Sequence, residues 1–147
     1  MTRLDVIGRL LVAVQFALLG WLVWPLTAQV WSPPALALLA CAAALGLWTL
    51  VHNRPGNFNI RPEPKASGRL VTGGPYRYVR NPMYSALLLF AAAEVLAYAD
   101  VWKIACWIAL ALVLFAKALL EERGLRALFP DYAAYAKRVR RFIPGVF

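Results

Sequence analysis

The residues best suited to chemistry lie in one dense stretch, residues 72–84, which reads TGGPYRYVRNPMY. Paired glycines let backbone approach a ligand closely, and Pro82 suits the first turn of a helix, whose free N–H groups can receive an anionic group. Tyrosines and arginines add aromatic surfaces and donors for a carboxylate. This composition suits a binding site, and by itself it suits equally well a basic loop with tyrosines at a membrane interface.

A second group of charged residues comprises Lys117, Glu121 and Glu122. Helical spacing puts Lys117 and Glu121 on one face, where they can pair, while Glu122 points about a third of a turn away. Carboxylates at the C-terminal end of a helix oppose the helix dipole, and a cationic ligand such as a sulfonium would explain them. A solvated salt bridge is the alternative.

Metal chemistry and disulfides find no support in the sequence. His52 is the only histidine, and Cys41 and Cys106 each stand alone in an apolar segment, so neither a multi-histidine site nor CxxC spacing is present. Glu94 is the one carboxylate deep in an apolar run, and we expect it to pair, with Lys103 as its candidate partner. A small four-span transporter that couples through Glu94 is the non-enzymatic alternative.

The elements that must position these residues are membrane helices. Hydrophobic residues make up 62% of the 147-residue chain, and no charge occurs from residue 10 to residue 51. We predict a single integral membrane domain, residues 1–147, with an all-α fold of four transmembrane helices at about residues 8–30, 34–51, 82–99 and 102–120. Residues 121–128 should continue the fourth helix, residues 129–131 should break it, and residues 132–139 should form a cytoplasmic amphipathic helical segment.

The distribution of charge supports this span count. With four spans, every lysine and arginine except Lys103 falls on one side, which predicts cytoplasmic termini at the inner (cell) membrane. Topology therefore accounts for the net charge of +9 without nucleic acid as a partner. A signal peptide is the competing interpretation of the N-terminus, but a second span follows directly and no small-residue cleavage site intervenes.

The two charged groups together resemble the isoprenylcysteine carboxyl methyltransferase and phospholipid methyltransferase families of integral membrane enzymes. The resemblance covers the chain from Arg69 onward and rests on residues 70–84 and on the tail pattern from Glu121 to Pro144. It implies that residues 52–81 and 121–147 form a cytoplasmic pocket for S-adenosylmethionine, open to lipid for the substrate. It assigns the following residues to the cofactor: Tyr76, Arg80, Asn81, Pro82, Tyr84 and Glu122. It also implies that Lys117 and Glu121 orient the substrate as the catalytic pair.

The chain departs from the family pattern at two positions. The usual Arg-His-Pro reads Arg80-Asn81-Pro82, and asparagine keeps a donor and an acceptor but cannot titrate near neutral pH. Lys117 stands where arginine is commoner in the carboxyl branch, and a lysine cannot hold a carboxylate bidentately.

The resemblance leads us to expect S-adenosylmethionine-dependent methyl transfer to a lipid or amphipathic acceptor, a carboxylate, thiol or amine delivered from the bilayer. The expected partners are this substrate and membrane lipids, with no nucleic acid and no metal. An NADPH-dependent sterol-type reductase is the enzymatic alternative, because its C-terminal ending resembles residues 141–144, Arg-Phe-Ile-Pro.

Overall fold

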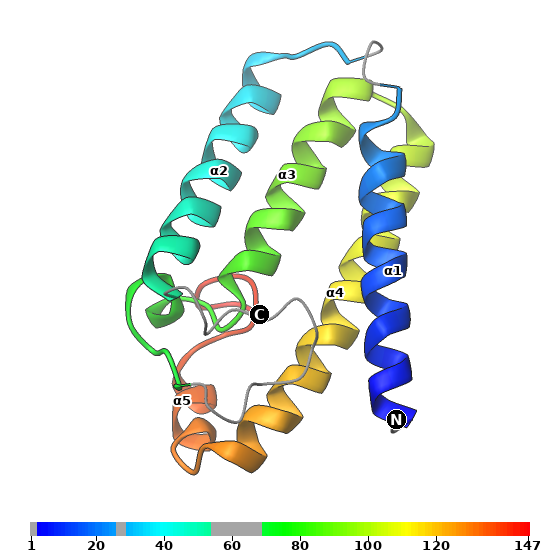
Figure 1. The fold of residues 1–147 in the computed structure, drawn as a ribbon. Helices are drawn as coiled ribbons and strands as arrows, with labels where there is room; N and C mark the ends of the chain where they lie inside the picture. The colour runs from blue at the N-terminus through cyan, green and yellow to red at the C-terminus, as the bar shows by residue number, and fades with distance from the viewer. Residues whose placement is uncertain (1–2, 26–28, 54–68) are drawn as a thin grey trace.

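The computed structural model describes residues 3–25, 29–53 and 69–147, whose named secondary-structure elements are all helices. The helices are α1 (Arg3–Val23), α2 (Pro33–Asn53), the 3₁₀ turn η1 (Gly74–Arg77), α3 (Pro82–Tyr98), α4 (Val101–Leu128) and α5 (Tyr132–Arg138), shown in Figure 1. The all-α prediction is therefore confirmed. The predicted pocket segment, residues 52–81, falls partly outside the described residues.

Helix bounds agree with the sequence prediction within two residues except at the two ends of α1, which begins at Arg3 where the first span was expected from about residue 8. The first span was expected to reach residue 30, but α1 ends at Val23, two residues before Pro25, because proline cannot continue a helix. The fourth helix continues to Leu128, breaks before Pro130, and is followed by α5, as predicted.

Three of the described helices, α1, α2 and α4, are long and apolar enough to cross a membrane. α3 is apolar but has 17 residues, or roughly 26 Å at 1.5 Å per residue. It contacts α1, α2 and α4 and lies between α2 and α1 in Figure 1. A four-span topology thus stays a prediction for this central, short helix.

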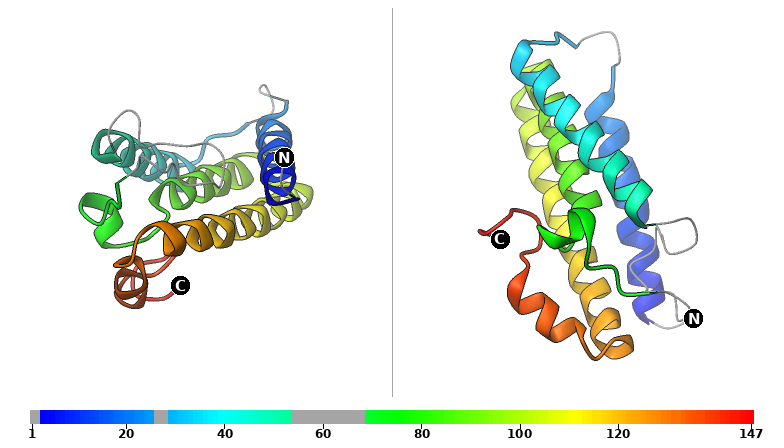
Figure 2. Two further views of the ribbon diagram at one scale, coloured as in Figure 1. Left: turned by 60° about the horizontal axis from the view of Figure 1, so that its bottom comes forward. Right: turned by 90° about the vertical axis from the view of Figure 1, so that its left-hand side faces the viewer.

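The buried positions of the outer helices recur every seven residues. α1 buries Gly8, Gln15 and Leu22, and α2 buries Ala35, Ala42 and Thr49. Such spacing is typical of left-handed helix packing, and the small residues on α2 let the backbones approach closely. Figures 1 and 2 agree that α2 packs on α3 while α1 packs on α4.

Lys103 closes the end of the bundle at which α1 finishes. Its ammonium donates hydrogen bonds to the carbonyls of Trp21, Leu22 and Trp24, and the side chain is only 4% exposed. The last carbonyls of a helix lack partners within the helix and carry partial negative charge, so a cation there is stabilising.

The expected pair between Glu94 and Lys103 does not form among the described residues. Glu94 instead accepts a hydrogen bond of 2.6 Å from the side-chain amide of Gln29, and it is 3% exposed. Lys103 is already satisfied by backbone carbonyls, so the nearest donor left for the buried carboxylate is the amide.

The opposite end of the bundle gathers the polar segments. The start of α1, the end of α2, the start of α3 and the last turns of α4 lie at one end in Figure 1, beside η1 and α5. Residues far apart in the chain that carry the candidate chemistry therefore meet there.

Candidate active site

Two short extended segments bring the candidate residues together. The backbone N–H of Arg80 donates to the Arg140 carbonyl at 2.7 Å, and that of Asn81 donates to the Arg141 carbonyl at 3.0 Å. The hydroxyl of Ser85 also donates to the Phe142 carbonyl at 2.8 Å. These bonds fasten the start of α3 to the tail, so residues 72–84 and the segment after α5 form one unit.

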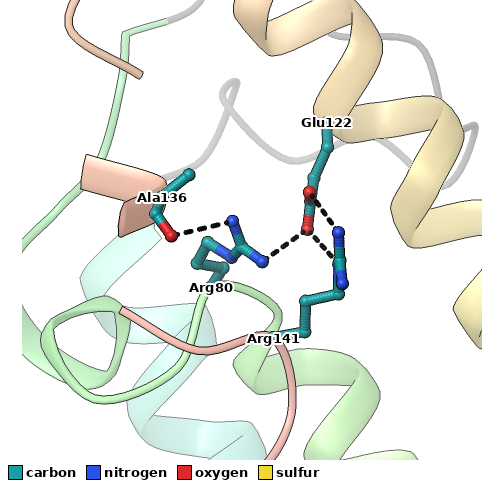
Figure 3. Close-up of polar contacts among 4 residues, drawn as sticks. All are labelled: Arg80, Glu122, Ala136 and Arg141. Carbon is teal, nitrogen blue, oxygen red and sulfur yellow. Dashed lines mark hydrogen bonds and ion pairs between the residues drawn. The ribbon is translucent and has the colours of Figure 1, made fainter. Parts of the chain in front are cut away.

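Glu122 lies at the centre of a buried ion-pair network (Figure 3). Arg141 donates two hydrogen bonds to its carboxylate, from Nε at 2.9 Å and from a terminal nitrogen at 3.2 Å. A terminal nitrogen of Arg80 lies 3.3 Å from the same carboxylate. Arg80 also donates to the Ala136 carbonyl at 3.3 Å. The side chains of Glu122 and Arg80 are only 5% and 8% exposed, and buried charges of this kind need such partners. The guanidinium groups of Arg80 and Arg141 therefore explain why an acidic residue is buried at this position, and a cationic ligand is not needed to explain it.

Two buried donors beside this network have no acceptor. Among the residues the structure describes, Arg80 Nε and Asn81 Nδ2 are the buried side-chain polar atoms without a hydrogen-bond partner. Buried polar groups are normally satisfied, so such donors fit a ligand that brings acceptors. S-adenosylmethionine carries a carboxylate, ribose hydroxyls and adenine nitrogens. The residues present thus fit that cofactor, and Asn81 offers a donor where the family has histidine.

Tyr84 stands between the two predicted catalytic residues. Its hydroxyl donates to Glu121 at 2.5 Å, and the Lys117 ammonium lies 5.1 Å from the centre of its ring. Lys117 donates its short hydrogen bond, 2.6 Å, to Gln15 of α1. Lys117 and Glu121 share a helical face as predicted, but the expected direct pairing is replaced by these two separate partners.

The tyrosines of η1 and α5 line the same region. The hydroxyl of Tyr135 donates to the Tyr76 carbonyl at 2.6 Å, and Tyr132 and Tyr135 are both buried. Burial, and then the negative charge of Glu121, raise the pKa of Tyr76 to about 12. The Tyr76 hydroxyl is therefore protonated at neutral pH and available as a donor.

Gly74 holds the turn that begins η1. Its φ of +56° lies in the left-handed region, and a Cβ at this position would come 2.5 Å from Cγ of His52 at the end of α2. Both the backbone conformation and the packed imidazole therefore require glycine. Pro75 and Pro82, which flank the loop, are fully buried. The loop is thereby fixed against α2 before it enters α3.

Comparison with known proteins identifies the family of this chain. The phospholipid methyltransferase family matches residues 33–132, more than half of the chain. The chain belongs to this family. It is also 37% identical over 87 residues to a protein of Cupriavidus metallidurans named Cobalt-zinc-cadmium resistance protein CzcN. That match covers 54% of this chain and 38% of the other protein's length.

For this member of the phospholipid methyltransferase family, the structure joins most of the predicted residues and adds two. Arg80 contacts Glu122 and Tyr84 contacts Glu121, while Asn81 and Pro82 begin α3. The predictions gave no role to Arg141, which the tail motif already contained. They also missed Gln15, although it is the only polar side chain in the apolar run 10–24. Both residues lie outside the range that the family match covers.

Proposed function

We propose that this membrane methyltransferase family member transfers a methyl group from S-adenosylmethionine to a lipid or other amphipathic acceptor at the cytoplasmic face of the cell membrane. The proposal includes four transmembrane helices and cytoplasmic termini. The observation that carries it is the pair of buried, unpartnered donors, Arg80 Nε and Asn81 Nδ2, where the start of α3 meets the tail segment of a chain that belongs to this family.

The cofactor side consists of residues held by the tail. Arg80 and Asn81 donate to acceptor atoms of the cofactor, and Glu122 keeps Arg80 in place through their ion pair. Bound S-adenosylmethionine supplies a methyl group on a positively charged sulfur. Methyl transfer of this kind needs positioning and exclusion of water more than a protein nucleophile. The half-buried Tyr76 of η1 and the buried Tyr132 and Tyr135 of α5 provide that exclusion.

The acceptor side consists of Lys117 and Glu121, and Tyr84 of the cofactor side contacts it through its hydrogen bond to Glu121. Lys117 lies one helical turn before Glu121 and therefore nearer the apolar part of α4, from which a lipid would arrive; it is 2% exposed. Its ammonium can orient an anionic group of the acceptor. Glu121, hydrogen-bonded to Tyr84, is the group that can take a proton from a thiol or an ammonium acceptor.

Calorimetric titration of the protein in lipid nanodiscs with S-adenosylmethionine tests the cofactor assignment. Wild-type protein should bind, and Asn81→Leu, which keeps the size but removes the donor, should weaken binding about tenfold or more. Tyr84→Ala and Glu122→Ala should lose binding, whereas Glu94→Gln at the other end of the bundle should match the wild type. Unchanged affinity in Asn81→Leu and Tyr84→Ala would contradict the site. Saturable binding of NADPH without S-adenosylmethionine binding would instead favour the reductase.

The acceptor class can be found with probes that differ only in the reacting group. Transfer of radioactive methyl from S-adenosylmethionine is measured to dodecanoate, dodecanethiol and dodecylamine, and to phosphatidylethanolamine vesicles. Methylation of at least one probe above a Glu121→Gln control is expected, because Glu121 lies beside the acceptor. Cofactor binding without any such transfer would contradict the proposed reaction.

A further inference from the structure

Gln15 interrupts the apolar part of α1, which runs from Leu10 to Val23. It is 5% exposed and belongs to the seven-residue series with Gly8 and Leu22 on the buried side of α1, the helix that packs on α4. An amide in such a position destabilises the fold unless it is hydrogen-bonded. Its oxygen accepts the 2.6 Å hydrogen bond from Lys117, so its burial is explained by that one partner.

Lys117 has a nearer charged neighbour in sequence. Glu121 follows it by one helical turn, and a lysine and a glutamate at this spacing ordinarily pair. In the structure Glu121 accepts from Tyr84 at 2.5 Å, and the ammonium is drawn toward α1 instead. A neutral amide thus takes the hydrogen bond of the ammonium in place of the carboxylate, and Lys117 and Glu121 form no direct ion pair.

We propose that Gln15 is a positioning residue of the methyl-transfer site: it holds the Lys117 ammonium on the α1 side and so keeps Glu121 hydrogen-bonded to Tyr84. The inference rests on the proposed function and adds α1 to the site. The hydrogen-bond partner of the Lys117 ammonium is a neutral amide, and the ammonium lies 5.1 Å from the centre of the Tyr84 ring. An anionic group on the acceptor is what this arrangement would hold best.

The alternative is that Gln15 only sets the register between α1 and α4, since a single polar residue in an apolar helix–helix interface can do so. α4 makes other polar contacts with α1 that serve this purpose. Cys106 donates to the Leu18 carbonyl at 3.4 Å, and Lys103 donates to the end of α1. These contacts provide matched controls, because they join the same helices away from Tyr84.

The first test follows the lysine ammonium groups by ¹⁵N NMR of lysine-labelled protein. Gln15→Leu should shift the Lys117 signal, as the ammonium turns to Glu121, and leave the buried Lys103 signal in place. Gln15→Glu should restore an acceptor at the same position. Joint shifts of both lysine signals would overturn positioning in favour of general loosening of α1, and an unchanged Lys117 signal would overturn the contact itself.

The second test separates positioning from stability by kinetics on the methylated probe. Gln15→Leu should lower kcat at least about tenfold, because small displacements at a reacting site are costly, with S-adenosylmethionine affinity within twofold of wild type. Gln15→Glu should keep kcat but raise KM for dodecanoate and not for dodecylamine, since its carboxylate repels an anion. A kcat for Gln15→Leu equal to that of Cys106→Ala would overturn the proposal. If wild-type protein binds no S-adenosylmethionine, the proposed function fails, and the NMR test still decides the role of Gln15.

Discussion

Arg141 is expected to be a major contributor to the stability of the site. Arg141→Gln removes two hydrogen bonds, of 2.9 and 3.2 Å, to a Glu122 side chain that is 5% exposed. A hydrogen bond to a charged group contributes about 1.5–3 kcal/mol, so two would contribute about 3–6 kcal/mol. Arg80 remains 3.3 Å from Glu122, and the Arg141 side chain is 26% exposed. Both facts reduce the expected loss of stability. We therefore expect the free energy of unfolding to fall by about 2 kcal/mol.

Reversible unfolding in mixed detergent micelles, followed by tryptophan fluorescence, measures this change. Arg138→Gln, an exposed charge on α5, is the control and should change the free energy of unfolding by less than about 0.5 kcal/mol. A double-mutant cycle with Glu122→Gln should give a coupling energy of about 1 kcal/mol or more. Additive effects in the cycle, or a loss in Arg141→Gln no larger than the control's, would refute the reasoning.

Three further changes follow from contacts described above. Gly74→Ala should destabilise the loop by about 1–2 kcal/mol and weaken S-adenosylmethionine binding, because of the positive φ of Gly74 and the clash of the new Cβ with His52. Adding His52→Ala to this variant should recover part of the lost stability, because it removes the clash and leaves the backbone strain. Full recovery of stability would contradict the backbone strain. Lys103→Met should lower the free energy of unfolding by about 2–4 kcal/mol, because it leaves carbonyls at the end of α1 without a donor. Glu94→Gln should change it by less than about 1 kcal/mol, since an amide oxygen can still accept from Gln29; in the same unfolding assay, a larger loss than in Lys103→Met would reverse the assigned roles.

The helices were largely predictable, because length, apolar runs and breakers act locally. Pro130 and its neighbours end α4 as expected, and α5 follows with Tyr132 and Tyr135 on its buried side. The end of α1 was misplaced because the apolar character of the sequence continues past Pro25, while the helix does not. Hydropathy sets where a chain can be buried, and backbone hydrogen bonding sets where a helix stops.

The sequence singled out most of the residues that the structure brings together at this end of the bundle, but it did not predict their contacts. Local composition and spacing identified residues 72–84 and the residues near Glu121, since those signals are carried by neighbours in sequence. The partners of Glu122, Lys117 and Glu94 were each decided by groups many residues away, Arg141, Gln15 and Gln29. In an interior of low dielectric constant a charged group is stable only when it is hydrogen-bonded or ion-paired. The packing of the helices decides which donors and acceptors lie close enough to be its partners. The sequence alone therefore determined the helices and the chemical groups of the candidate site, and only the tertiary structure decided which of those groups are paired and which donors remain free.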